Sequence, residues 1–179
     1  MIRLVNISDA SQILDVYRYY VENDSATFDV EVPTIEEMKQ KIQTICKVYP
    51  YLVYEIDGVI IAYAYAHPYY GRKAYLRNVE VSIYVHKDYL HQGIGKQLYQ
   101  KLFECLIELG YYKAYACITA SNQASVFMHE RLGFKKIGYF NQAGYKMNTW
   151  WDIVWMQKDL KAVENKVTEP KSIEHLRKL

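Results

Sequence analysis

The chain has 179 residues, 51% of them hydrophobic, and a formal net charge of +2 at pH 7. This length and composition predict one soluble domain with a sizeable core, and so small a net charge argues against a nucleic-acid partner. No apolar run is long enough to span a bilayer and the first residues lack a secretory pattern, so we expect a cytoplasmic protein with no membrane partner. The cysteines, Cys46, Cys105 and Cys117, are odd in number and lack metal-ligand spacing, which favours reduced thiols and no metal site.

Strands and helices alternate along the chain in the manner of a mixed α/β domain. The first half predicts a strand over 2–6, a helix from about 8 to 22, a loop over 23–33, a helix over 34–46, a hairpin of strands 51–56 and 59–67, a loop over 67–73, and a strand over 79–85. Thr34 and Glu37 have the spacing of a capping box at the second helix. Asp57-Gly58 is typical of a hairpin turn.

The second half continues the alternation. It predicts a helix from the glycine turn at 92–95 to Gly110, a strand over 111–118, a helix over 122–133, and a closing pair of strands over 134–140 and 146–157. We expect residues 1–158 to form a single domain. Residues 159–179 are charged, lack aromatic side chains and contain Pro170, so we expect a C-terminal tail.

The strand over 79–85 carries a carboxylate among apolar residues. Its apolar positions Val79, Val81, Ile83 and Val85 alternate with Glu80, Ser82 and Tyr84. Alternation of this kind predicts one apolar and one polar face. A carboxylate on such a strand is costly unless it is solvated or paired, which makes a cleft the natural place for Glu80. The alternative is an edge strand with a wet face.

Gln92-Gly93-Ile94-Gly95 joins this strand to a long amphipathic helix. Glycine lets the backbone approach a ligand closely, and free N–H groups at a helix start attract phosphate, so a pyrophosphate would fit there. The phosphate-binding motif of nucleotide hydrolases is absent, because Gln97 stands where a hydroxyl is needed, and the dinucleotide motif is incomplete. Gly-x-Gly by itself is more often a plain turn.

The helix over 122–133 begins near Asn122 and contains His129. Their spacing of seven residues places both on one helix face, about 10.5 Å apart along the axis. A lone helical histidine is more often a core or rim residue. Its occurrence together with Glu80 and the glycine turn favours a role in an active site.

Further segments complete the pattern: 49–58, 62–66, 72–75, 128–130, 143–146 and 151–152. With the three segments above, they resemble the GNAT superfamily of N-acetyltransferases, and within it the phosphinothricin acetyltransferase branch, over nearly the whole chain. One position departs from the superfamily pattern Arg/Gln-x-x-Gly-x-Gly/Ala, because Leu90 replaces its first polar residue. The resemblance implies a mixed, mostly antiparallel central sheet flanked by helices on both faces.

The resemblance also implies a reaction in which an amine attacks the thioester of acetyl-CoA directly. A primary amine is mostly protonated near neutrality, so a base is needed, and Glu80 is implied in that role, through an ordered water. Val85 N–H is implied as the donor to the thioester oxygen, and His129 as the acid that protonates the leaving thiolate. The implied cofactor-binding residues are Tyr84, Val85, His91, Gln92, Gly93, Ile94, Gly95, Lys96, Asn122 and Ser125.

The branch acts on the α-amines of small acids such as phosphinothricin, methionine sulfone and methionine sulfoximine. A pocket for them should present a cation, and Arg72 and Arg77, which flank Tyr75, are the candidates. Two solvated loop arginines are an equally good interpretation. Three alternatives stay open: acylation of a peptide or protein amine, a non-catalytic CoA-binding regulatory module, and a homodimer rather than a monomer.

Overall fold

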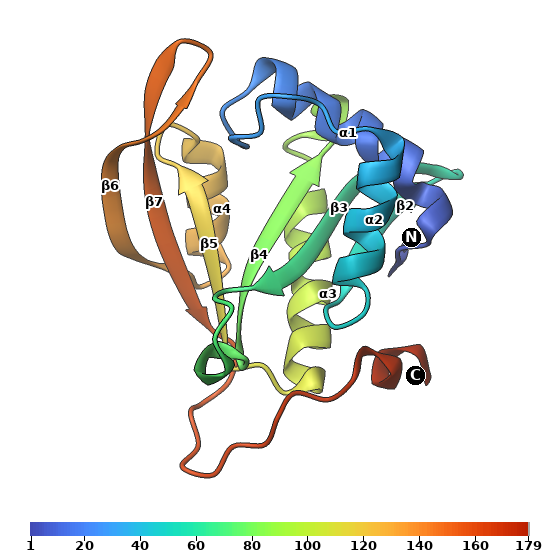
Figure 1. The fold of residues 1–179 in the computed structure, drawn as a ribbon, viewed down its shortest axis with the longest axis vertical. Helices are drawn as coiled ribbons and strands as arrows, with labels where there is room; N and C mark the ends of the chain where they lie inside the picture. The colour runs from blue at the N-terminus through green and yellow to red at the C-terminus, as the bar shows by residue number, and fades with distance from the viewer. Residues whose placement is uncertain (179) are drawn as a thin grey trace.

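The computed structural model describes the backbone of residues 1–178 and the side chains of residues 1–176. In this described part a seven-stranded sheet has the order β1-β2-β3-β4-β5-β7-β6 (Figure 1). Its strands are β1 (Ile2–Leu4), β2 (Tyr51–Ile56), β3 (Val59–Pro68), β4 (Asn78–Val85), β5 (Lys113–Thr119), β6 (Lys135–Lys146) and β7 (Thr149–Asp159). Neighbouring strands are antiparallel except β4 and β5, which run parallel.

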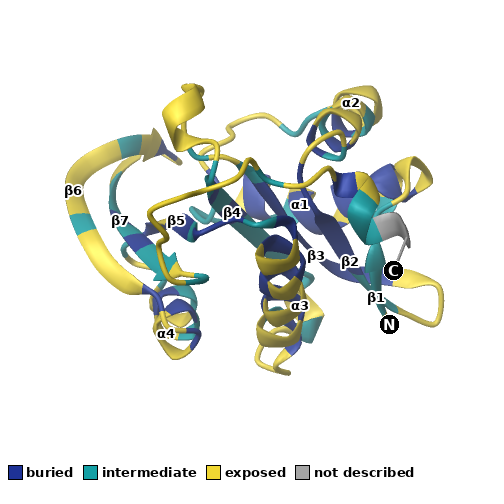
Figure 2. Cartoon of the chain, turned by 90° about the horizontal axis from the view of Figure 1, so that it is seen from below, coloured by how far each residue is buried: buried dark blue, intermediate teal, exposed yellow. Residues whose placement is uncertain are grey.

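Helices cover both faces of the sheet. The four α-helices are α1 (Ala10–Asn23), α2 (Ile35–Ile45), α3 (Ile94–Leu109) and α4 (Gln123–Arg131). Figure 2 shows α2 on one side of the sheet and α3 and α4 on the other, and α1 packs against β3 and β4 on the side of α2. The expected architecture, a mixed and mostly antiparallel sheet between two helical layers, is confirmed.

Local signals in the sequence fix several ends of elements. Thr34 Oγ1 accepts a hydrogen bond from Glu37 N at 3.2 Å, and Glu37 Oε2 accepts one from Thr34 N at 2.7 Å, which completes the predicted capping box of α2. Asp57 and Gly58 are both left-handed, with φ of 49° and 81°, and form the turn between β2 and β3. Gly110, with φ of 94°, ends α3 as predicted.

Four expectations about local structure need correction. The first strand ends at Leu4, because a 3₁₀ turn, Ile7–Asp9, precedes α1 and Asn6 caps it. The loop expected over 141–145 belongs to β6, because Met147 and Asn148, with φ of 54° and 57°, form the connecting turn instead. Strand β5 begins at Lys113 rather than Tyr111. Cys117 lies on a strand of the predicted core, where a cysteine is most often a small buried hydrophobe; in the structure it is exposed, because the sheet opens beside β5.

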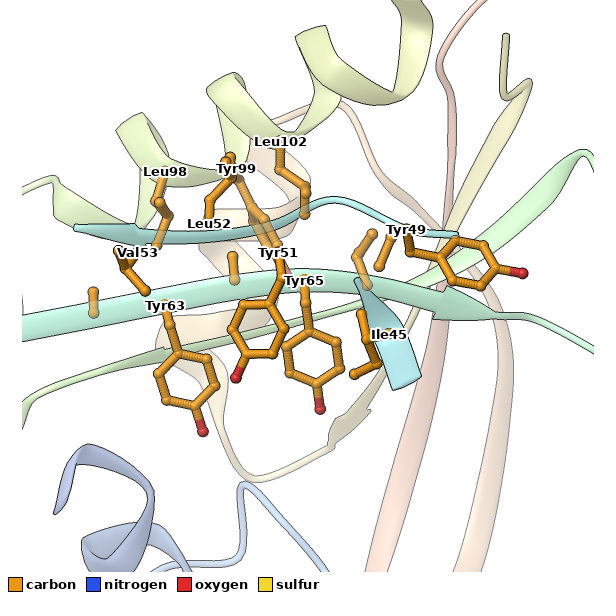
Figure 3. Packing of buried hydrophobic residues seen from close by; sticks show 14 of the residues in the cluster. Ile45, Tyr49, Tyr51, Leu52, Val53, Tyr63, Tyr65, Leu98, Tyr99 and Leu102 are labelled. Carbon is orange, nitrogen blue, oxygen red and sulfur yellow. The ribbon is translucent and has the colours of Figure 1, made fainter. Parts of the chain in front are cut away.

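Tyrosine rings fill much of the core on the α1–α2 side. Figure 3 shows Tyr51, Tyr63 and Tyr65 pointing away from α3, whereas Leu98 and Leu102 reach the sheet from α3 on the other side. Tyr51 stacks on Tyr63 at 5.8 Å and on Tyr65 at 4.8 Å between ring centroids. These stacked rings make a rigid aromatic layer beside the strands that carry the candidate site.

The segment after β7 returns to the body of the molecule. Lys171 N donates to Leu109 O at 2.7 Å, Lys171 and His175 both contact Glu108, and Ile173 is buried. Residue 179, the last of the predicted tail, lies outside the described residues. Among the helices that the structure describes, none has the length and apolar character needed to cross a membrane.

Candidate active site

A cavity of about 500 Å³ opens where β4 and β5 diverge. The two strands pair only between Asn78–Glu80 and Lys113–Tyr115, although both continue toward their carboxyl ends. The start of α3 and one side of α4 close the cavity. Of the predicted cofactor-binding residues, Tyr84, Val85, His91, Gly93, Ile94, Gly95, Lys96, Asn122 and Ser125 line it, together with His129.

The divergence leaves backbone groups of β4 without a neighbouring strand. His86 N donates to Ile61 O of β3, and Arg77 O accepts from Tyr112 N next to β5. Because strand residues alternate, the odd-numbered positions of β4 direct their N–H and C=O groups toward β5. Beyond Glu80 these groups face the cavity. Tyr20 Oη donates to Val85 O, which holds the carboxyl end of β4 in place. Val85 is an odd-numbered position, so its N–H is directed into the opening.

The glycine turn presents the start of α3 to the same cavity. Gly93, with φ of 76°, is the N-cap, and no side chain hydrogen-bonds to the first N–H groups of this helix. These groups and the helix dipole make an anion site. A Cβ at Gly95 would lie 3.1 Å from Met128 Sδ, a tight contact that would displace the methionine side chain at the cavity wall. Gln92 does not line the cavity; its side-chain amide donates to Asp88 O at 3.3 Å.

Glu80 lies on the α1–α2 face of β4, opposite to Val79 and Val81, as the alternation predicted. Its side chain is 22% exposed, and burial raises its pKa to about 7. His67 of β3 is its register partner, with Nε2 4.0 Å from Glu80 Oε1. Burial lowers the pKa of His67, so the ring is neutral near pH 7 and does not counteract the effect of burial on Glu80. A carboxylate with a pKa near neutrality is suited to act as a general base.

His129 is buried beside the cavity. Its Nδ1 lies 2.8 Å from Ser125 O, and its ring packs edge-on against Tyr99 and Phe134, with centroids 5.2 and 4.9 Å away. Burial lowers its pKa to about 4, so the ring is neutral at pH 7, and the contact with a carbonyl oxygen assigns the proton to Nδ1. Nε2 is then an acceptor, and it has no partner among the described residues.

Asn122 and His129 both belong to this site but have different roles in the helix. Asn122 Oδ1 accepts from Ser125 N at 3.0 Å and caps α4. Its side-chain oxygen is therefore engaged locally, which leaves the amide N–H₂ for a ligand. The predicted placement of both residues at one cavity agrees with the structure.

The acceptor-binding residues Arg72, Tyr75 and Arg77 stay a prediction; they lie in the 3₁₀ turn Lys73–Tyr75 or beside it, before β4. Arg77 Nε donates to Thr168 O at 3.0 Å, and Arg72 is exposed. Neither arginine forms an ion pair or hydrogen bond with Glu80 in the described part of the chain. Tyr75 is connected to the surroundings of Glu80 through Tyr69. The ring centroids of Tyr75 and Tyr69 are 6.0 Å apart. Tyr69 in turn stacks at 3.9 Å on Tyr115, the β5 neighbour of Glu80.

His67, Tyr20 and Lys146 contact the candidate site or the loop beside it, and no sequence motif predicts these roles. Lys146 is buried, and its Nζ donates to Tyr20 O, Asp24 O and Thr27 O at 2.9, 2.6 and 2.8 Å. These bonds hold the loop after α1 beside the cavity, which Ala26 lines. The sequence carries no signal for such contacts, because the partners are backbone atoms more than 100 positions away.

Comparison with known proteins identifies the family. The model of the acetyltransferase (GNAT) domain matches residues 2–155. The chain belongs to the GNAT acetyltransferase family. A phosphinothricin N-acetyltransferase of Streptomyces viridochromogenes is 33% identical over 158 residues, which cover 88% of this chain and 86% of that protein. An L-methionine sulfoximine/L-methionine sulfone acetyltransferase of Pseudomonas aeruginosa is 31% identical, covering 89% and 94%.

Solved structures of this acetyltransferase family share the fold. A GNAT superfamily phosphinothricin acetyltransferase from Sinorhizobium meliloti, solved in complex with AcCoA, has a TM-score of 0.90 at 34% identity and covers 94% of this chain and 93% of its own. A ribosomal-protein-alanine N-acetyltransferase from Brucella melitensis has a TM-score of 0.85 at 29% identity, covering 89% and 99%. The resemblance inferred from the sequence is confirmed, and the chain is an N-acetyltransferase.

Proposed function

We propose that this acetyltransferase transfers the acetyl group of acetyl-CoA to the α-amine of a small amino-acid-like acceptor. One observation carries the proposal: Glu80, whose pKa is about 7, directly precedes the β4 residues 81–85 that line the cavity, at the point where the pairing of β4 with β5 ends. Glu80 itself is not part of the cavity lining. Acyl transfer to an amine needs both an anion and amide site for the donor and a base for the acceptor.

The cavity fits the donor in three respects. The uncapped start of α3 suits a pyrophosphate, because its N–H groups and dipole favour negative charge. The unpaired edge of β4 offers hydrogen bonds to the amide groups of a pantetheine arm. The third is His129, which lines the cavity and whose buried Nε2 lacks a hydrogen-bond partner among the described residues. Acetyl-CoA supplies the activated thioester.

Glu80 removes the proton of the acceptor ammonium, through an ordered water, and the free amine then attacks the carbonyl carbon. The new C–N bond forms as the C–S bond breaks. Val85 N–H stabilises the negative charge that develops on the carbonyl oxygen, and the hydrogen bond from Tyr20 to Val85 O holds the adjoining peptide at the end of β4.

His129 remains the candidate for protonating the thiolate. Because its ring is neutral and Nδ1 is bonded to Ser125 O, Nε2 must accept a proton before it can donate one. A thiol has a pKa of about 8.5, so the thiolate is a good leaving group without prior protonation. The contribution of His129 to the rate is therefore expected to be smaller than that of Glu80.

The acceptor class is supported by the relatives named for phosphinothricin, methionine sulfone and methionine sulfoximine. Acetylation of a peptide N-terminus is the second candidate, because the Brucella neighbour is named for ribosomal-protein alanine.

A thiol-release assay with acetyl-CoA distinguishes the two candidate acceptor classes. We expect turnover with phosphinothricin or methionine sulfone and little with a peptide that begins with alanine. Efficient peptide acetylation without turnover of the small acids would contradict the proposed acceptor.

A further inference from the structure

A lysine from α2 stands over the aromatic layer on the acceptor face of the sheet. Lys41 Nζ lies 5.3 Å from the ring centroid of Tyr17 and 5.2 Å from that of Tyr65. Both distances are in the range of cation–π contacts. Two rings therefore hold the ammonium group in one place, although Lys41 is distant in sequence from every segment used in the proposed reaction.

This ammonium group lacks an anionic partner. Within the described residues no carboxylate forms an ion pair with Lys41 Nζ at 4 Å or less, and Asp29, which contacts the ring partner Tyr17, accepts a hydrogen bond from Tyr17 Oη. Lys39, two residues earlier on the same helix, is paired with Glu36 at 2.7 Å. Lys41 is half-buried, so partial loss of water strengthens its attraction for a bound anion.

Lys41 and Glu80 share one face of the sheet. Tyr65 and His67 alternate on β3, their ring centroids are 5.7 Å apart, and His67 is the register partner of Glu80. The charge of Lys41 contributes to lowering the pKa of His67, the neighbour of Glu80 on β3. Two side chains nevertheless separate Lys41 from Glu80.

Because Lys41 and Glu80 are not adjacent, Lys41 can contact only a part of the acceptor that lies away from its reacting amine. In an amino acid the α-carboxylate is attached to the same carbon as the α-amine, so an amine at Glu80 keeps that carboxylate close to β4. To come near Lys41, an acidic group at the far end of the side chain would have to extend past His67, which lies between Glu80 and Tyr65 on this face. Among the described residues, Arg77 instead donates to Thr168 O, and Arg72 is exposed.

We propose that Lys41 binds the distal anionic group of the acceptor side chain and so favours acceptors with a charged head over neutral ones. The inference rests on the proposed function, since it names the substrate feature that this acetyltransferase site selects. A charge-assisted contact in a partly buried site corresponds to roughly ten- to hundredfold in affinity.

The test compares two acceptors of similar size, phosphinothricin with an anionic phosphinate and L-methionine sulfone with a neutral head. The ratio of their kcat/KM values is measured for the wild type, Lys41→Met, Lys41→Arg and the matched control Lys39→Met. We expect Lys41→Met to lower the phosphinothricin-to-sulfone ratio roughly ten- to hundredfold, through KM rather than kcat. Lys41→Arg should keep most of the ratio, and Lys39→Met should not change it.

Thermal stabilisation by acetyl-CoA is measured for every variant, so that a folding defect is recognised separately. An unchanged ratio in Lys41→Met, or a wild type that acetylates only the sulfone, would overturn the role of Lys41 and leave the proposed function standing. A wild type that acetylates neither acceptor would overturn both. If Lys41→Met denatures, Lys41→Gln gives the same comparison.

Discussion

The two sides of the opening between β4 and β5 differ in the groups that form them: one consists mainly of backbone and the other of side chains. On the α3–α4 side, the proposed donor site consists mainly of backbone: the N–H of Val85, the turn at Gly93 and the uncapped start of α3. On the α1–α2 side, the proposed acceptor site consists of side chains from separate elements: Glu80, His67 and Lys41. A backbone site depends on chain path and tolerates many side chains, whereas a side-chain site changes with single substitutions. We therefore expect donor binding to be common to relatives and acceptor choice to be particular to this chain.

Glu80→Gln is expected to have the largest effect, because it removes the base from the acceptor side and leaves the donor side intact. The rate should fall roughly 10²- to 10⁴-fold, while acetyl-CoA affinity, measured by calorimetry, stays near that of the wild type. Since burial raises the pKa of Glu80 to about 7, wild-type kcat/KM should rise with pH through that value. Full activity of the variant would assign the base elsewhere.

The raised pKa of Glu80 also predicts how the stability of the protein depends on pH. Its folded pKa is raised above the usual carboxyl value, so its stabilising contribution is present at acid pH and is lost as pH rises through about 7. Glu80→Gln should therefore unfold at a higher temperature than the wild type at pH 8, and the gain should shrink at pH 5. Melting curves of both proteins at the two pH values provide the measurement.

Gly95→Val should weaken binding at the proposed donor site, on the α3–α4 side of the opening. Its Cβ would meet Met128 Sδ at 3.1 Å and lie 3.6 and 3.7 Å from atoms of Ile83 and Val85, which fills the lining of the cavity. We expect acetyl-CoA to bind at least about tenfold more weakly, with a smaller change in acceptor KM. Gly71→Ala is the control, because a Cβ there has no neighbour within 4 Å. Equal acetyl-CoA affinity in Gly95→Val and wild type would remove the glycine turn from the donor site.

His129→Phe is expected to reduce turnover less than Glu80→Gln does, by about tenfold, because the thiolate leaves readily. Acid stability gives an independent measurement. The folded pKa of His129 is lowered to about 4, so wild-type stability should fall as pH decreases from about 6.5 through 4. The variant should lose part of that dependence. Wild-type turnover in the variant would restrict His129 to packing against Tyr99 and Phe134.

Leu90→Arg should have the smallest effect and should improve the donor side. Leu90 is 41% exposed and lines the cavity beside the glycine turn, at the position where the superfamily pattern has a polar residue. An exposed arginine near a bound phosphate contributes little, so acetyl-CoA affinity should rise by no more than a fewfold. The gain should disappear at high salt. A loss of affinity would mean that Leu90 contacts an apolar part of the donor.

The sequence predicted the donor side well because its signals are local. Alternation along 79–85, the glycines at 93 and 95 and the cap at Asn122 are each contained in a short segment, and each is present in the structure. The same holds for the capping box of α2 and the turn at Asp57-Gly58. The resemblance to the family added the identity of the donor.

The acceptor side has no comparable local signal in the sequence. Arg72 and Arg77 are predicted because they flank Tyr75 just before the strand of Glu80, and they stay a prediction; in the structure Arg77 donates to a carbonyl of the C-terminal segment. Lys41 and His67 come from α2 and β3, and only the packing of α2 on the sheet brings the ammonium over Tyr65. Periodicity assigns a residue to a face, and it does not say which distant residue shares that face.

The sequence by itself therefore determined the order of the elements, the face on which Glu80 lies and the turn that starts α3, because backbone preference and alternation act over a few residues. The tertiary structure decided the rest. The divergence of β4 from β5 frees the backbone of β4, burial moves the pKa of Glu80 to about 7 and that of His129 to about 4, and α2 places Lys41 opposite an aromatic layer. Each of these features depends on packing between residues that are far apart in the chain. No short segment of the sequence therefore specifies it.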